Sequence, residues 1–288
     1  MIQIENNKIQ ITIAEKGAEL QSIKANGLEY MWSGDPTFWG KHSPVLFPIV
    51  GGLKNNSYSF DGKSYQLGRH GFARNTIFTV LDKPKNGSVL LGISDSEETK
   101  KVYPFSFQFM IQYTLDEDYL HIEYSVKNTD TQPMYFSVGA HPAFAVPLEK
   151  HLSYEDYSLL FNKQEDSNIF PLDDNGQTLM ESVPFLKKTN ELPLKKSLFY
   201  KDALVFKDLK STEITLKSEK GQHGLTVAFE GFPYMGIWSA KDADFVCIEP
   251  WNGIADNVKA NGDITQKEGI HSLQPAEVFR AKWSIRFF

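Results

Sequence analysis

Two titratable residues each stand directly before a proline at the end of an apolar stretch. His141 precedes Pro142 in MYFSVGAHPAF, and Glu249 precedes Pro250 in DFVCIEPWNG. Proline cannot donate to a strand ladder, and it biases the preceding residue toward extended backbone, so both strands are expected to end there. Histidine titrates near neutrality, and burial raises the pKa of a glutamate. The two residue types can therefore serve as a general acid and a general base.

Alternation along the first stretch predicts how the histidine is presented. Successive strand side chains point to opposite faces, so one face is apolar and the other carries only small residues before the histidine. The apolar face holds Phe136, Val138 and Ala140, and the other holds Ser137, Gly139 and His141. We expect the first set to enter the core and the second to leave open space beside the imidazole.

The second stretch predicts a lined pocket around its carboxyl group. Val246 and Ile248 alternate with Phe245, Cys247 and Glu249, and Trp251 and Asn252 follow. Sugar rings have an apolar face and hydroxyl edges, so aromatic residues with a few polar groups suit them. Trp251 and Asn252 are therefore candidate substrate-binding residues.

Two further stretches carry charged residues in unusual settings. GRHGFARN, residues 68–75, crowds Arg69, His70 and Arg74 into one loop, and LFYKDALVF places Asp202 inside an apolar segment. Each has a simpler interpretation. The loop could be a solvated turn, Asp202 could cap a turn, and a histidine at a strand end is more often structural. The single cysteine, Cys247, reads as a small buried hydrophobe rather than a nucleophile.

Period-two alternation along the chain predicts the strands that must position these residues. Hairpins are expected around Asn6-Asn7, Asn86-Gly87, residues 116–118 and residues 221–224, with a final strand that ends the chain. Residues 148–196 are more polar and are expected to form long excursions between strands. The pattern predicts an all-β protein of mostly antiparallel strands packed as a large sandwich.

Composition excludes several classes of protein. The 288 residues suit one domain, 1–288, and the net charge of −6 offers no clustered basic surface for nucleic acid. The sequence shows no bilayer-spanning apolar run, signal peptide, phosphate-binding glycine loop, dinucleotide motif or metal-ligand motif. With one cysteine there is no intrachain disulfide. We expect a cytoplasmic protein with no membrane or nucleic-acid partner.

Taken together, the stretches resemble the aldose 1-epimerase (galactose mutarotase) superfamily. Residues 44–75 look like its N-terminal signature, GAHPAF like the segment of its general acid, and CIEPWNG like the segment of its general base. The HGFAR and EPWNG forms look closest to the divergent bacterial branch with the LacX proteins and glucose-6-phosphate 1-epimerases. The resemblance covers essentially the whole chain and implies a β-supersandwich.

The resemblance also implies roles for individual residues. Glu249 would take the proton from the C1 hydroxyl, and His141 would protonate the ring oxygen. His70 would bond the sugar near that oxygen, and Asp202 would hold ring hydroxyls. An arginine of the galactose-specific branch corresponds to Lys54, with Arg74 as a substitute, so galactose specificity is not implied.

Three hypotheses follow from these residues. The first is an aldose 1-epimerase acting on a free hexose, with His141 and Glu249 facing each other across a sugar-sized gap. The second is the same reaction on a hexose 6-phosphate, with Arg69, Arg74, Lys41 and Lys54 as phosphate partners. The third is a non-catalytic carbohydrate-binding or sensing protein. Ring opening needs only an acid and a base, so we expect no cofactor and no metal. Nothing distinguishes a monomer from a homodimer.

Overall fold

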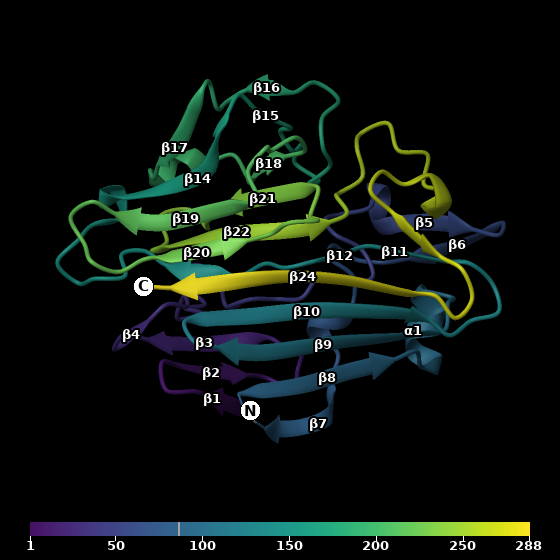
Figure 1. Ribbon diagram of the computed structural model, residues 1–288. Coiled ribbons are helices and arrows are strands. Elements are labelled where there is room, and N and C mark those ends of the chain that lie inside the picture. Colours follow the sequence, from purple (N-terminus) through teal and green to yellow (C-terminus); the bar gives the residue numbers. More distant parts are fainter. Residues whose placement is uncertain (86) are drawn as a thin grey trace.

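The computed structural model describes residues 1–85 and 87–288 and consists mostly of β-strands (Figure 1). Every pairing between its named strands is antiparallel. The predicted all-β class of antiparallel strands is therefore confirmed.

The largest sheet forms one broad layer, in which β24, β10, β9 and β8 lie side by side (Figure 1). Its strand order is β17-β14-β19-β20-β24-β10-β9-β8-β7. In chain order these strands are β7 (Thr79–Lys85), β8 (Ser88–Ser94), β9 (Phe107–Asp116), β10 (Tyr119–Asn128), β14 (Tyr157–Glu165), β17 (Thr189–Pro193), β19 (Glu213–Ser218), β20 (Leu225–Ala228) and β24 (Val278–Phe287).

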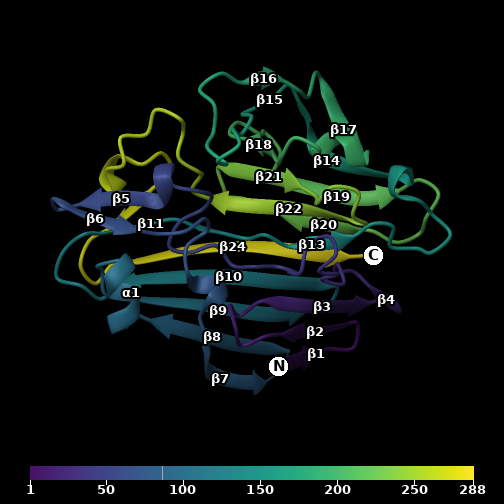
Figure 2. The ribbon, with the colours of Figure 1, turned by 180° about the vertical axis from the view of Figure 1, so that it is seen from behind.

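Two smaller sheets lie against one face of this layer, as the views from the two sides show (Figures 1 and 2). The first contains β1 (Ile2–Glu5), β2 (Ile9–Ile13), β3 (Leu20–Ala25) and β4 (Leu28–Glu29). The second, the site sheet, contains β12 (Val138–Gly139), β13 (Ala143–Ala145), β18 (Leu204–Phe206), β21 (Tyr234–Trp238) and β22 (Phe245–Asn252).

Short ribbons and helical turns complete the fold. The ribbons pair β5 (Ser57–Phe60) with β6 (Lys63–Gln66), β11 (Met134–Phe136) with β23 (His271–Leu273), and β15 (Asn168–Ile169) with β16 (Val183–Pro184). The helical segments are α1 (Glu97–Val102) and the 3-10 turns η1 (Lys54–Asn56), η2 (Ala73–Asn75), η3 (Tyr154–Asp156), η4 (Lys196–Phe199) and η5 (Ile264–Gln266).

One apolar core joins the three layers. It includes Ile11 of β2, Phe109 of β9 and both Val246 and Ile248 of β22. Alternate β22 residues therefore face the large sheet, and the residues between them point to the outer side of the site sheet. The segment before His141 alternates in the same way. Phe136, Val138 and Ala140 belong to this core, which confirms the expected core face.

All four expected hairpins are confirmed by strand pairing. They are β1–β2, β9–β10, β19–β20 and β7–β8, although Asn86 itself lies outside the described residues. The description of residues 148–196 as excursions was wrong. β14 lies there, and Tyr157, Leu159 and Phe161 alternate into the core. Among the described residues, no helix is long and apolar enough to cross a membrane.

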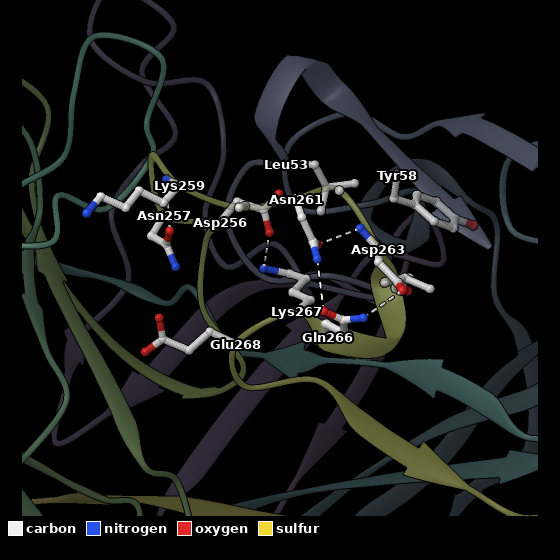
Figure 3. A pocket seen from close by; sticks show the side chains of 13 residues that line it. Leu53, Tyr58, Asp256, Asn257, Lys259, Asn261, Asp263, Gln266, Lys267 and Glu268 are labelled. Atoms are coloured by element: carbon white, nitrogen blue, oxygen red, sulfur yellow. Dashed lines mark hydrogen bonds and ion pairs between the residues drawn. The ribbon is translucent and has the colours of Figure 1, made fainter. Parts of the chain in front are cut away.

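The loop between β22 and β23 is anchored by a buried ion pair. Lys267 Nζ lies 3.0 Å from Asp256 Oδ1 and also donates to the Ile254 carbonyl, beside a cavity of about 210 Å³ (Figure 3). The second Asp256 oxygen accepts the Lys54 backbone N–H at 2.9 Å. Burial lowers the pKa of the Lys267 ammonium. The pair thereby ties the end of β22 to the segment that enters η1.

Replacing Asp256 by Asn should destabilise the protein by about 3–5 kcal/mol, because it leaves the buried Lys267 ammonium without its counter-charge. Urea unfolding measures the difference. The control is Glu219→Gln, which removes the exposed partner of Lys217 and should cost at most about 1 kcal/mol. Equal small losses in both variants would contradict an anchoring role for the buried pair.

Candidate active site

The register of the site sheet places His141 opposite Glu249. Gly139 pairs with Trp251, and Ala143 pairs with Cys247, on either side of the two titratable residues. The Ala140 N–H donates to the Pro250 carbonyl at 3.0 Å and closes the intervening segment. His141 Nε2 consequently lies 3.4 Å from Glu249 Oε2. The two side chains are in contact, so the expected sugar-sized gap between them is wrong.

A cavity of about 430 Å³ opens over this pair. Its walls combine aromatic rings with cationic groups, and the His141–Glu249 pair forms part of its lining. The lining residues are Trp39, Pro44, Arg69, His70, Arg74, His141, Phe199, Lys201, Asp202, Ala203, Trp238, Ser239, Ala240, Lys241, Glu249 and Trp251. The volume is within the range of small-molecule sites.

Burial governs the protonation of the pair. It lowers the pKa of His141 to about 3 and raises the pKa of Glu249 well above its ordinary value. Burial therefore favours an uncharged imidazole and a protonated carboxyl group in the pair. The positive charge of Arg69 acts in the opposite direction on Glu249 and favours its ionised form.

His70 presents an N–H group to the same space. Its Nδ1 accepts the Gly51 backbone N–H at 3.1 Å, so in the neutral ring the proton lies on Nε2. Burial holds the His70 pKa well below its usual value, and the His141 ring lies 5.8 Å away. His70 also has a φ of +68°, a left-handed conformation that costs a non-glycine residue about 1–3 kcal/mol. Such strain is typical of functional sites.

Asp202 and Arg74 line the cavity as expected. One Asp202 oxygen accepts the Ala203 backbone N–H at 2.7 Å. Arg74 donates to the Arg69 carbonyl at 2.9 Å. Among the described residues, neither the Arg69 nor the Arg74 guanidinium group makes an ion pair within 4.0 Å.

Glycines seat Trp251 in the cavity wall. A Cβ on Gly139 would lie 2.8 Å from the Trp251 ring, and one on Gly236 would lie 2.4 Å from it. The space beside His141 that the sequence predicted to be open is therefore filled by the indole. Glycine at position 139 serves ring packing rather than ligand access.

The sequence analysis did not identify two aromatic residues of the site. The Trp39 ring stacks on His141 with a centroid distance of 5.0 Å, and Trp238 meets the imidazole edge-on at 5.6 Å. Trp238 ends β21, so its alternation with Gly236 on the same face could have indicated it. Trp39 lies outside the named strands, and no local pattern marks it.

Three residues considered for binding lie outside the cavity. Lys54 is held elsewhere, because its ammonium group donates to the Val258 carbonyl at 2.9 Å. Asn252 is buried beyond Trp251 in β22, and Lys41 does not contribute to the lining. The expected roles of Lys54, Asn252 and Lys41 are therefore wrong, and Lys201 and Lys241 are the lysines at the cavity.

Comparison with known families identifies the class to which this β-sandwich protein belongs. Residues 1–271 match the family described as aldose 1-epimerase, and the chain belongs to that family.

Relatives place the chain in the LacX-like branch. It is 34% identical to "Protein LacX, chromosomal" of Lactococcus lactis subsp. lactis, covering 99% of this chain and 98% of the relative. A galactose mutarotase related enzyme from Lactobacillus acidophilus is 38% identical, with a TM-score of 0.95 over 99% of this chain and 96% of that one. A galactose mutarotase-like protein from Lactobacillus casei ATCC 334 is 32% identical, with a TM-score of 0.94 over the full length of both chains.

The raised pKa of Glu249 predicts a pH-dependent stability difference. The unfolded glutamate ionises near pH 4.3, whereas the folded one keeps its proton to higher pH. Between the unfolded and the folded pKa of Glu249, the folded protein therefore binds a proton that the unfolded protein has lost. In this pH range the free energy of unfolding falls as pH rises, by at most about 1.4 kcal/mol per pH unit. Glu249→Gln removes this pH dependence, so the variant should gain stability relative to the wild type between about pH 5 and about pH 7.

Urea unfolding of both proteins across that range measures the difference. His141 adds the opposite trend, since its lowered pKa makes stability fall as pH drops from about 6.5 toward about 3. Because His141 contacts Glu249, the same comparison in a His141→Asn background removes the histidine effect from both proteins. A stability difference that stays constant with pH would show that Glu249 ionises normally.

Proposed function

We propose that this protein is an aldose 1-epimerase that interconverts the α and β anomers of a hexose, with His141 as acid and Glu249 as base. The observation that carries the proposal is the contact of this pair at 3.4 Å in the wall of a sugar-sized cavity. The hydroxyl oxygen to be deprotonated and the ring oxygen to be protonated share one carbon, C1. Two groups in contact can therefore address both oxygens at once.

The chemistry balances with one proton taken and one given. Glu249 removes the proton of the C1 hydroxyl, the bond from C1 to the ring oxygen breaks, and His141 protonates that oxygen. The open-chain aldehyde turns about its C1–C2 bond. Ring closure on the other face returns both protons with the roles of the pair reversed.

The protonation that burial favours in the free protein is opposite to the one that begins ring opening. The carboxylic acid and neutral imidazole of the free pair are also the forms that accompany the open-chain sugar. Transfer of the Glu249 proton to His141 gives the carboxylate and imidazolium that begin ring opening. A bound sugar supports this transfer, because its hydroxyl groups solvate both charges. Arg69 favours the carboxylate but disfavours the imidazolium, so its charge does not by itself drive the transfer.

The remaining cavity residues provide positioning. His70 offers its Nε2–H to the sugar near the ring oxygen, Asp202 accepts hydroxyl protons, and Trp251 offers an apolar face. We also infer a single domain over residues 1–288, located in the cytoplasm and working as a monomer or homodimer. Light scattering and cell fractionation test the last two points.

Glu249→Gln and His141→Asn should each lower the catalysed anomer exchange by about 10²–10⁴-fold, because each removes one partner of the proton transfer. Exchange spectroscopy by NMR measures the rate with glucose, galactose and their 6-phosphates. Lys54→Met is the control, since Lys54 lies outside the cavity, and it should keep the wild-type rate.

These exchange rates distinguish an epimerase from a carbohydrate-binding protein. If Glu249→Gln exchanges anomers as fast as the wild type, Glu249 is not the base. If the wild type binds sugars but accelerates none of them, the protein is a carbohydrate-binding or sensing protein instead.

A hexose 6-phosphate is the second candidate substrate, and one observation favours it. Arg69, Arg74, Lys201 and Lys241 line the cavity, and none has an ion-pair partner within 4.0 Å among the described residues. Burial and the charge of Arg69 lower the pKa of Arg74, so this arrangement of cations is costly without an anion. Arginine groups match phosphate oxygens in a fork geometry.

Arg74→Gln should raise KM for glucose 6-phosphate by roughly 10–100-fold, the effect of losing one charged hydrogen bond, and change KM for glucose much less. Steady-state exchange rates with both sugars measure the split. Lys41→Gln, outside the cavity, should change neither KM. An equal loss with both sugars would assign Arg74 to the sugar ring and remove the support for a phosphate.

A further inference from the structure

The acid–base pair has a third chemical group beside it, the thiol of Cys247. Cys247 and Glu249 point to the same face of β22, and His141 lies opposite Glu249 on the neighbouring segment. One ligand atom from each of the three residues lies within 4.8 Å of the other two. We propose that His141, Cys247 and Glu249 form a binding site for a thiophilic divalent cation, zinc above all, and that its occupancy inhibits the enzyme.

The distances are close to those of a tetrahedral zinc site. Zinc bonds of roughly 2.0–2.1 Å to nitrogen and oxygen place neighbouring ligand atoms about 3.3 Å apart. His141 Nε2 and Glu249 Oε2 already lie 3.4 Å apart. A zinc–sulfur bond of about 2.3 Å requires the Cys247 sulfur to lie about 3.6 Å from each of the other two ligand atoms. A side-chain rotation that moves the sulfur by roughly 1 Å meets this requirement.

An independent observation shows that the site has unused binding capacity. Glu249 is 1% exposed, and its Oε2 atom, which faces His141, has no hydrogen-bond partner. His141 Nδ1 is also buried without a partner. Buried polar atoms are normally satisfied, so an acceptor left open toward a histidine and a thiol is suited to a cation.

The donor set selects the class of metal. Sulfur, imidazole nitrogen and one carboxylate oxygen suit zinc and its neighbours, whereas magnesium and calcium require oxygen ligands. Binding releases the thiol and carboxyl protons to the solvent. The two resulting negative charges offset the charge of the cation, which matters in a buried position. Three protein ligands leave a fourth position for water on the cavity side.

Inhibition follows from the identity of the ligands and rests on the proposed function. The metal would occupy the Glu249 lone pair that accepts the sugar proton and the His141 nitrogen that returns it. Cys247 touches neither reacting oxygen and belongs to an apolar cluster with Ala143 and Phe245. Its loss should therefore weaken metal binding while the mutarotation rate remains.

Cobalt(II) gives a readout that does not depend on activity. Cys247 is the only cysteine of the chain, so a thiolate-to-cobalt charge-transfer band on the intact protein reports this site alone. We expect the band in the wild type, its loss in Cys247→Ala, and its displacement by zinc. The matched control is His151→Ala, which removes an exposed histidine and should leave the band unchanged.

Inhibition of anomer exchange by zinc is the second measurement. Cys247→Ala should require about tenfold more zinc or higher for half-inhibition. Cys247→Val provides a second apolar replacement, and near-ultraviolet circular dichroism confirms its folding. Absence of the cobalt band, or equal zinc sensitivity with and without the thiol, overturns the metal site. A cobalt band in a protein without mutarotase activity overturns the proposed function and leaves the metal site standing.

Discussion

The candidate site depends on the antiparallel pairing between β22 and the segment formed by β12 and β13. This register brings His141 against Glu249, and a shift by one residue would turn one of the two side chains into the core. The same register sets the Cys247 thiol beside them and seats Trp251 against Gly139. The candidate acid, the candidate base and the cavity wall therefore all depend on one strand alignment.

Burial of this pair determines its chemistry. Trp39 and Trp238 enclose the imidazole, and the carboxyl group is inaccessible to bulk water. Exclusion of water disfavours the charged forms of both groups. Burial therefore opposes the carboxylate and imidazolium forms, and the proposed ring opening requires the bound sugar to favour them.

Sequence reasoning identified the fold class and seven of the sixteen lining residues, because the relevant signals are local. Alternation marks the strands, and prolines mark the ends at His141 and Glu249. It failed where a position depends on distant packing. Lys54 carries a suitable charge, yet backbone carbonyls of the loop after β22 hold its ammonium group elsewhere. Trp39 forms part of the wall although nothing in its neighbourhood of the chain predicts it.

The sequence by itself determined which residues could be acid, base and sugar contacts, and that they stand on strands of a β-sandwich. Side-chain alternation and proline chemistry act over a few residues and are readable there. Only the tertiary structure decided that His141 and Glu249 touch rather than face each other across a gap, and that Cys247 joins them. Those distances follow from strand register and from the packing of rings contributed by remote segments.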